Sequence, residues 1–233
     1  MRRTAIVTGG TGGLGSAVVE RLLDEGQRVV VPWIVEHELD RVERREGVEL
    51  VRADLFDPAA VQEVVALAAS DREAPLHGLV NLVGGFSVGG RVHETPVEEF
   101  EKQFRLNLRA TYLMIQACLP RMLENDPPSR GAIVCVGTRA AVQPFKGAAG
   151  YVASKAAVIA LAQAVAVEYK DDLISANAIL PSVIDTPGNR AAMPNADFSR
   201  WVKPAQIAGV ISHLLSDDSD PVNGAAIPVY GRA

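Results

Sequence analysis

A glycine-rich stretch near the start of the chain constrains the fold more than any other feature. Residues 8–15 read Thr-Gly-Gly-Thr-Gly-Gly-Leu-Gly. The apolar run 4–7 precedes them, and the helix-like run 16–25 follows. Glycines in such a turn let phosphates approach the backbone, and a helix N-terminus offers free N–H groups and a positive dipole end to an anion. Strand, glycine turn and helix in this order predict a doubly wound fold that binds a dinucleotide.

The alternation of apolar runs with helical patterns supports this interpretation. We expect strands at 4–8, 28–31, 48–52, 78–82, 132–136, 174–179 and 226–229. We expect helices near 14–25, 36–45, 58–69, 96–123, 151–169 and 204–215. Thr95, Pro96 and Glu98 form a capping-box pattern that predicts the start of the fourth helix. The alternation predicts one α/β domain over residues 1–233, a Rossmann-type doubly wound parallel sheet of about seven strands with helices on both faces.

Composition excludes several classes of function. The chain has 233 residues and a net charge of −5, with 48% hydrophobic residues, which is typical of one soluble domain. No basic tract is longer than Arg44-Arg45, so we expect no nucleic-acid partner. No apolar run approaches the ~20 residues of a membrane span, and no signal peptide precedes the first strand, so we expect a cytoplasmic protein without a membrane partner. Cys118 and Cys135 lie in apolar runs and are expected to be buried free thiols, with no metal site.

The segment 181–203 breaks the regular pattern. It is rich in Pro, Asn, Ala and Met and has no clear periodicity. A connection this long in a compact domain is usually functional, often as a lid over a site, although a passive surface loop is the alternative.

Tyr151 and Lys155 are the strongest candidates for chemistry. Their i, i+4 spacing in a helical, alanine-rich run places both on one helical face. A phenol titrates near pH ~10, and a neighbouring ammonium would stabilise the phenolate and lower that pKa. The pair could therefore exchange a proton with a carbonyl or an alcohol while a nicotinamide moves the hydride.

With these motifs in this order, the chain resembles the short-chain dehydrogenase/reductase family over essentially its whole length. The family's glycine pattern and its Tyr-x-x-x-Lys motif match at residues 8–15 and 151–155. Its Asn-Asn-Ala-Gly segment is altered but recognisable at residues 81–85, which read Asn-Leu-Val-Gly-Gly. The resemblance implies that the catalytic residues are Asn107, Thr138, Tyr151 and Lys155. It also implies that the cofactor contacts are Thr8, Gly9, Gly13, Leu14, Gly15, Trp33, Asp54, Leu55, Asn81, Gly84, Tyr151, Lys155, Pro181, Ile184 and Thr186.

Two departures concern the catalytic and nicotinamide sites. Thr138 stands where the family usually has serine, which keeps the hydroxyl but adds a methyl that stiffens χ1 and narrows the pocket. The usual Pro-Gly pair reads Pro181-Ser182. The backbone beside the nicotinamide is therefore expected to turn a little differently.

A third departure concerns the choice of cofactor. Family members that use NAD usually carry an acid at the end of the second strand, whereas NADP users carry a nearby base or a base in the glycine loop. This chain has Trp33 at the first place and Gly12 at the second, and Glu36 is the nearest acid. An uncompensated phosphate dianion costs more than an unmade hydrogen bond, which favours NAD(H) over NADP(H). Trp33 could pack under the adenine or partly fill its pocket.

The segment 181–203 also resembles the corresponding segment of dihydropteridine reductases, with the shared pattern Asp-Thr-Pro-x-Asn-Arg-x-x-Met-Pro-x-Ala-Asp-Phe-Ser-x-Trp. Flat aromatic walls could hold a heterocycle. The candidate substrate contacts are Phe86, Thr138, Arg139, Phe145 and Trp201. Phe198 and Trp201 could instead only anchor the lid.

Three functions remain open at this stage. The first is an NAD(P)(H)-dependent oxidoreductase acting on a carbonyl or alcohol of a small molecule. The second is a pterin reductase that uses the same tyrosine, and the third is a non-catalytic nucleotide sensor or scaffold. The family resemblance also implies a homodimer or homotetramer, often built on the helices near 96–123 and 151–169.

Overall fold

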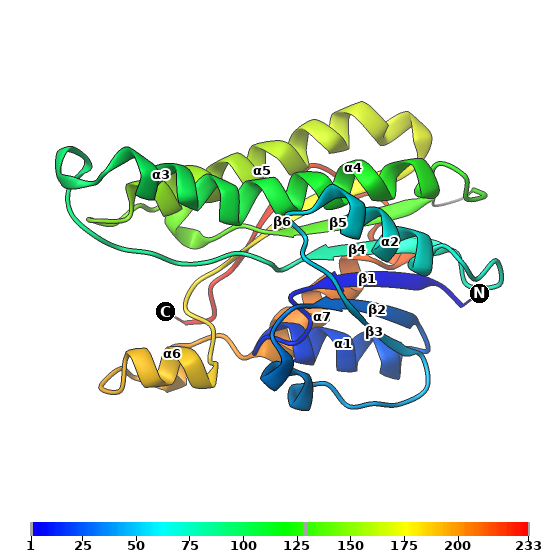
Figure 1. Ribbon diagram of the computed structural model, residues 1–233, viewed down its shortest axis with the longest axis horizontal. Helices are drawn as coiled ribbons and strands as arrows, with labels where there is room; N and C mark the ends of the chain where they lie inside the picture. Colours follow the sequence, from blue (N-terminus) through cyan, green and yellow to red (C-terminus); the bar gives the residue numbers. More distant parts are fainter. Residues whose placement is uncertain (1, 128–129, 233) are drawn as a thin grey trace.

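The computed structural model describes residues 2–127 and 130–232. Within these residues a single seven-stranded sheet forms, with every strand pairing parallel and the order β3-β2-β1-β4-β5-β6-β7 (Figure 1). The strands are β1 (Thr4–Thr8), β2 (Arg28–Trp33), β3 (Val48–Arg52), β4 (Leu76–Asn81), β5 (Gly131–Val136), β6 (Ile174–Pro181) and β7 (Ala226–Val229). The strand order reverses between β1 and β4. The predicted doubly wound parallel sheet is therefore confirmed.

Helices cover both faces of this sheet. They are α1 (Gly15–Asp24), α2 (Pro58–Ala68), α3 (Val97–Phe104), α4 (Ala110–Met122), α5 (Ala149–Tyr169), α6 (Pro187–Ala192) and α7 (Pro204–Leu214). In Figure 1, α2, α4 and α5 lie above the sheet and α1 and α7 below it. Each strand alternates its side chains between two cores: Ile6 belongs to the core under α2, α4 and α5, and Ala5 and Val7 to the core under α1 and α7. Burial on both faces explains the continuous apolar strands of the sequence.

Two predicted helices and one predicted helix cap differ from the structure. Residues 36–45 were expected to form one helix, but a short 3₁₀ helix occupies Glu36–Arg41. The segment 96–123 contains α3, then a π-helical turn at Arg105–Arg109, then α4. Thr95 does not cap α3, because its hydroxyl donates to the carbonyl of Arg91 at 3.0 Å. The loop before α3 therefore folds on itself and takes the hydroxyl that the capping pattern had assigned to the helix.

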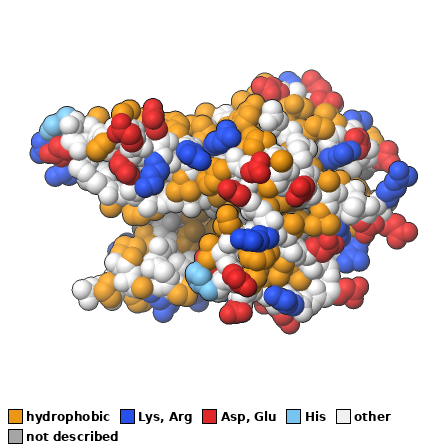
Figure 2. Space-filling model, in the orientation of Figure 1, with side chains coloured by type: hydrophobic (Ala, Val, Ile, Leu, Met, Phe, Trp, Pro, Cys, Tyr) orange, Lys and Arg blue, Asp and Glu red, His pale blue; other side chains and the backbone are white. Residues whose placement is uncertain are grey.

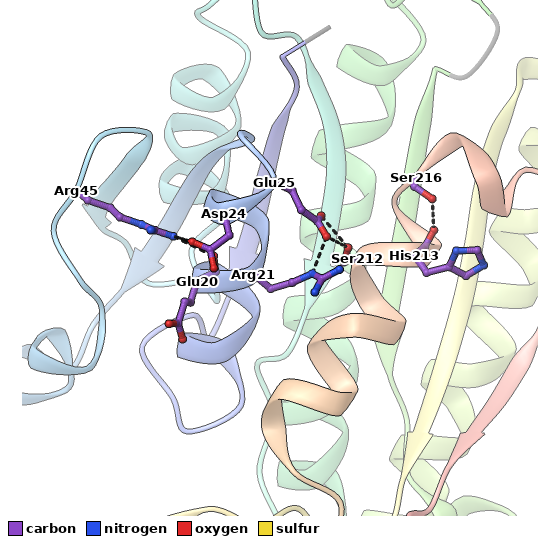
Figure 3. Close-up of polar contacts among 8 residues, drawn as sticks. All are labelled: Glu20, Arg21, Asp24, Glu25, Arg45, Ser212, His213 and Ser216. Carbon is purple, nitrogen blue, oxygen red and sulfur yellow. Dashed lines mark hydrogen bonds and ion pairs between the residues drawn. The ribbon is translucent and has the colours of Figure 1, made fainter.

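Polar contacts join α1 to α7 (Figure 3). The Ser212 hydroxyl on α7 lies 2.6 and 2.7 Å from the two carboxylate oxygens of Glu25, which follows the last residue of α1. Arg21 also donates to Glu25, at 2.6 Å. A carboxylate at a helix C-terminus is unfavourable for the helix dipole, so these donors offset that cost.

Helix α5 and its 3₁₀ extension, residues 149–172, are long and apolar enough to cross a membrane by length and composition alone. This differs from the sequence expectation that no run approached that length. Val158, Ile159 and Ala162 of this helix are buried in the core beside β5 and β6. The core helix of a soluble protein passes the same test, so the finding is weak evidence for a span.

The two cysteines are buried and neither forms a disulfide, as expected. Burial raises the pKa of Cys118, and raises that of Cys135 to about 12. Both thiols are therefore protonated and unreactive at neutral pH. In the described part of the chain, no group of three or more His, Cys, Asp or Glu side chains could hold a metal ion.

Candidate active site

The candidate site lies along the carboxyl edge of the sheet, where most of the proposed contact residues follow the ends of strands. They are, at or after the end of each strand, Thr8, Gly9, Gly13, Leu14 and Gly15 for β1, Trp33 for β2, Asp54 and Leu55 for β3, Asn81 and Gly84 for β4, Thr138 for β5, and Pro181, Ile184 and Thr186 for β6. Parallel strands end at one edge, so the fold brings these residues from distant parts of the sequence to a common line. In open α/β sheets ligands bind at this edge, near the point where strand order reverses.

The glycine turn after β1 requires its glycines. A Cβ atom on Gly15 would lie 2.0 Å from the carbonyl oxygen of Gly9, and a Cβ on Gly10 would lie 2.7 Å from a methyl of Val31. Gly9 itself has φ +66°, which favours glycine. The hydroxyl of Thr8 accepts from the backbone N–H groups of Leu82 and Val83 at 3.1 and 3.3 Å, and so joins the turn to the loop after β4. This bare backbone turn, opening directly into α1, fits a dinucleotide pyrophosphate.

Tyr151 and Lys155 project from α5 toward the ends of β4 and β5. The Thr138 side chain is close enough to the Tyr151 hydroxyl to influence the pKa of that tyrosine. The Lys155 ammonium donates to the carbonyl of Val136 at 2.8 Å. A Cβ atom on Gly84 would lie 3.0 Å from Lys155 Nζ and 2.6 Å from Asn107 Oδ1. The structure therefore brings the four proposed catalytic residues together.

Asn107 sits in the π-helical turn between α3 and α4 and is fully buried. Its Oδ1 accepts from the N–H of Gly85 at 2.9 Å, and its Nδ2 donates to the Ser154 hydroxyl at 3.0 Å. Single π-helical turns are frequent at functional sites because they redirect a side chain within a helix. Asn107 thus connects the loop after β4 to the helix that carries Tyr151 and Lys155.

Burial dominates the titration of the two α5 groups. Desolvation lowers the pKa of Lys155 to about 8. Desolvation is also the largest influence on Tyr151 and raises its pKa, while the hydrogen bond with Thr138 acts in the opposite direction. From the sequence we expect the Lys155 ammonium to lower the pKa of this tyrosine. In the structure the cost of burying a phenolate is the larger influence, and the pKa of Tyr151 is raised.

One exposed aromatic ring contacts Tyr151, and a second exposed ring lies next to the first. The Phe86 ring meets the Tyr151 ring edge-on, with centroids 5.0 Å apart, and Phe145 lies 6.2 Å from Phe86. Phe86 is 62% exposed and Phe145 48%. Figure 2 shows a hollow between the surface over α3 and the lid helix α6. Exposed aromatic rings beside the partly buried residues Tyr151 and Thr138 are suited to the apolar part of a small ligand.

The other two proposed substrate residues have different surroundings. Trp201 is only 8% exposed and packs against Phe198, with ring centroids 4.8 Å apart, an arrangement that fits the anchoring role considered above. The Arg139 guanidinium lies 5.2 Å above the ring centre of Tyr230, and its Nε donates to Gln143 at 2.8 Å. Arg139 is thus held beside Thr138 as a positive group.

The segment 181–203, the predicted lid, is internally braced and meets the glycine turn. Arg190 of α6 binds both carboxylate oxygens of Asp185, at 2.5 and 2.9 Å, and its guanidinium lies 4.8 Å above the ring centre of Phe198. At the base of the lid, a Cβ atom on Gly13 would lie 3.1 Å from the side chain of Thr186, the residue that caps α6. The turn and the lid therefore touch.

Near the end of β2 the structure shows contacts that sequence reasoning missed. Trp33 lines a cavity of about 500 Å³ together with Leu39 and Leu50. The residues that contact the glycine turn are Glu38 and Arg41, which the 3₁₀ helix after β2 brings to it. Both contact Thr11: Glu38 Oε2 accepts from its hydroxyl at 2.9 Å, and Arg41 donates to its carbonyl at 3.4 Å. No spacing of residues in the sequence indicates these contacts, because Glu38 and Arg41 reach the glycine turn only when the 3₁₀ helix folds back toward it.

Asp54 and Asn81, also proposed as cofactor contacts, have structural partners. Asp54 Oδ1 accepts from the N–H of Phe56 at 2.9 Å, which shapes the turn after β3. Asn81 is buried, with its amide 4.0 Å from the sulfur of Cys135. Leu55 is buried against the α2 core. These residues position the loops at the carboxyl edge of the sheet.

Comparisons with known proteins agree with this geometry. The family model described as short chain dehydrogenase matches residues 3–197. The chain is 33% identical over 249 residues to 2-(R)-hydroxypropyl-CoM dehydrogenase of Xanthobacter autotrophicus, covering 99% of this chain and 98% of that protein. It is 31% identical to the 3-oxoacyl-[acyl-carrier-protein] reductase MabA of Mycobacterium tuberculosis, covering 98% of this chain and 92% of that protein.

A solved structure shows the same fold. The structure described as ElxO with NADP bound has a TM-score of 0.89 at 24% identity, covering 99% of this chain and 98% of that one. The family match extends from the glycine turn, through the Tyr-Lys helix, into the lid. The chain therefore belongs to the short-chain dehydrogenase family and is an oxidoreductase of that family.

Proposed function

We propose that this protein is an NAD(P)(H)-dependent dehydrogenase or reductase that interconverts a carbonyl and an alcohol on a small molecule. The observation that carries the proposal is the convergence of Tyr151, Thr138 and Lys155 at the end of β5. The Thr138 side chain acts on the pKa of Tyr151, and the Lys155 ammonium donates to the carbonyl of Val136 at 2.8 Å. The relatives support the reaction class, since one is named for a hydroxypropyl group and another for a 3-oxoacyl group. Both names describe a carbon that carries either a hydroxyl or a ketone.

In this proposal, the bound nicotinamide supplies or accepts the hydride. Tyr151 gives its phenol proton to the carbonyl oxygen during reduction, or takes a proton from the alcohol during oxidation. Thr138 orients that oxygen through its hydroxyl. Lys155 holds the nicotinamide ribose, and as an ammonium it favours the phenolate that forms when Tyr151 donates. Asn107 acts as a positioning residue, because its side chain fixes Gly85 and Ser154.

The glycine turn and the N-terminus of α1 would hold the pyrophosphate, with Thr8, Gly9, Gly13, Leu14 and Gly15 as its contacts. Pro181, Ile184 and Thr186 would line the nicotinamide. We propose NAD(H) in preference to NADP(H), since the turn carries Gly12 and β2 ends in Trp33. We also propose a single domain with a lid over residues 181–203.

The test is a Tyr151→Phe variant assayed on secondary alcohols and ketones, with absorbance of the reduced nicotinamide as the readout. Loss of general acid–base catalysis should lower kcat by at least ~10²-fold. Affinity for the reduced dinucleotide should stay within about threefold, because the phenol oxygen is a small part of that contact. Tyr169→Phe on the same helix is the matched control and should keep full activity. Undiminished turnover by Tyr151→Phe would contradict the mechanism.

Pterin reduction is the second candidate, favoured by the exposed rings of Phe86 and Phe145 beside Tyr151. Here the substrate would be quinonoid dihydropterin, stacked on these rings. The decisive measurement is oxidation of NADH and NADPH by this substrate above the uncatalysed rate. In this case Phe86→Ala should raise KM for the pterin more than it lowers kcat. Tight dinucleotide binding without turnover of any carbonyl or pterin would instead support a non-catalytic sensor.

We further propose a cytoplasmic homodimer or homotetramer associated through α4 and α5. Phe104, Leu108, Tyr112 and Leu161 line an apolar groove of about 450 Å³ on these helices. Tyr112 is 49% exposed there. Light scattering of the purified protein measures the assembly, and Tyr112→Glu should shift it toward the monomer.

A further inference from the structure

The strongest unassigned feature is a three-residue contact on the glycine turn. The carboxylate of Glu38 accepts from the hydroxyl of Thr11 at 2.9 Å and from the guanidinium of Arg41 at 3.0 Å. Arg41 donates in addition to the carbonyl of Thr11. Thr11 is 4% exposed, whereas the side chains of Glu38 and Arg41 are 29% and 47% exposed. Thr11 is therefore fixed within the turn, whereas the side chains of Glu38 and Arg41 face solvent.

We propose that Glu38 replaces the missing acid at the end of β2 and sets a preference for the dinucleotide that lacks a 2′-phosphate. This inference rests on the proposed dinucleotide function. Glu38 lies five residues beyond Trp33, and the 3₁₀ helix Glu36–Arg41 returns it to the turn. A carboxylate in this position accepts hydrogen bonds from the two hydroxyls of a ribose diol.

The charge of the contact argues against a 2′-phosphate. Arg41 is the cation that reaches Thr11, and Glu38 already neutralises it at 3.0 Å. A phosphate dianion placed beside Thr11 would meet the Glu38 carboxylate at close range, and like charges in a half-buried site disfavour each other. Glu38 therefore serves both as an acceptor for the diol and as a repulsive group against the phosphate.

The same contact contains a latent phosphate site. Without the Glu38 charge, Arg41 would remain beside the turn as an uncompensated guanidinium, a group well suited to binding phosphate. Removing one carboxylate should therefore both weaken the diol contact and add a phosphate contact. These two effects change the cofactor preference in the same direction.

The experiment measures dissociation constants of NADH and NADPH, by the fluorescence of the bound reduced nicotinamide, without any substrate. The wild-type protein should bind NADH at least tenfold more tightly than NADPH. Glu38→Gln should reduce that ratio at least tenfold, with a gain for NADPH and a loss for NADH. Adding Arg41→Met to Glu38→Gln should abolish the NADPH gain. Glu38→Asp, which keeps the charge, should retain more of the preference than Glu38→Gln.

Glu43→Gln is the matched control, because Glu43 is exposed on the same connection, and it should leave the ratio unchanged. A wild-type preference for NADPH, or an unchanged ratio in Glu38→Gln, would overturn the inference. A shift produced by Glu36→Gln and not by Glu38→Gln would overturn it too. These outcomes leave the proposed dehydrogenase or reductase activity standing, although a wild-type preference for NADPH would also overturn the proposed preference for NAD(H). Failure of the wild-type protein to bind either dinucleotide would refute both the inference and the proposed activity.

Discussion

The Ser212 hydroxyl lies between the two carboxylate oxygens of Glu25, 2.6 and 2.7 Å away (Figure 3). This contact joins two helices that have no direct part in the chemistry. Helix α1 begins at the glycine turn, and α7 begins directly after the lid. The contact therefore helps to hold the turn and the end of the lid in a fixed relative position.

Ser212→Ala should lower the free energy of unfolding by about 1–2 kcal/mol, because the Glu25 carboxylate loses a partly buried donor. For a chain of this size, each 1 kcal/mol corresponds to a shift of about 2–4 °C in Tm. Ser216→Ala is the control, since its hydroxyl bonds only the carbonyl of His213 at the exposed end of α7. Equal Tm values for Ser212→Ala and the wild-type protein would contradict the importance of this contact.

Gly15→Ala should abolish dinucleotide binding, because its methyl would lie 2.0 Å from the carbonyl oxygen of Gly9 and the turn would have to open. Gly209→Ala in α7 is the opposite case, since nothing lies within 4 Å of its added methyl. Alanine in a helix interior is more favourable than glycine by about 1 kcal/mol, so this variant should gain stability. Fluorescence titration and thermal unfolding of both variants measure the two effects. Tight binding by Gly15→Ala would show that the turn is not the dinucleotide site.

Asn107→Ala should impair both stability and turnover. It leaves the N–H of Gly85 and the hydroxyl of Ser154 without this partner in a buried site, which costs about 2–3 kcal/mol. Displacement of Gly85 and of α5 should lower kcat more than it raises KM for the dinucleotide. Urea unfolding and steady-state kinetics on the same sample separate the two effects. A variant with wild-type stability and kcat would exclude Asn107 as a positioning residue.

Stability should fall in mild acid because of His77. Burial is the largest cause that lowers the pKa of this imidazole, from its ordinary value to about 4. The unfolded chain therefore binds the proton first, so the stability that neutral His77 provides is complete above about pH 6.5 and is lost between about pH 6.5 and 4. The full loss is on the order of 3 kcal/mol. Urea unfolding at pH 7 and pH 5 should show a smaller difference for His77→Gln than for the wild-type protein. The exposed His37→Gln should retain the wild-type difference.

The sequence predicted well what depends on local pattern. Apolar runs of β-branched residues fixed the seven strands, and the glycine spacing identified the turn before α1. Features that depend on how separate segments meet were not predicted. A helical pattern continues through Asn107 without any sign of a π-helical turn, and Thr95 fits a capping box although its hydroxyl bonds the preceding loop. The contacts of Glu38 and Arg41 with the glycine turn were not predicted, because they depend on a 3₁₀ helix that folds back after β2.

Arg190, Asp185, Phe198 and Trp201 form one connected group within the lid. Their contacts lie inside the segment, so they would persist through any change in its position relative to the glycine turn. If the segment closes over a substrate as proposed, the side-chain entropy of these residues is lost once, during folding, and not again in each catalytic cycle. The energy that a substrate gains on binding would then be available for holding the reacting atoms in place.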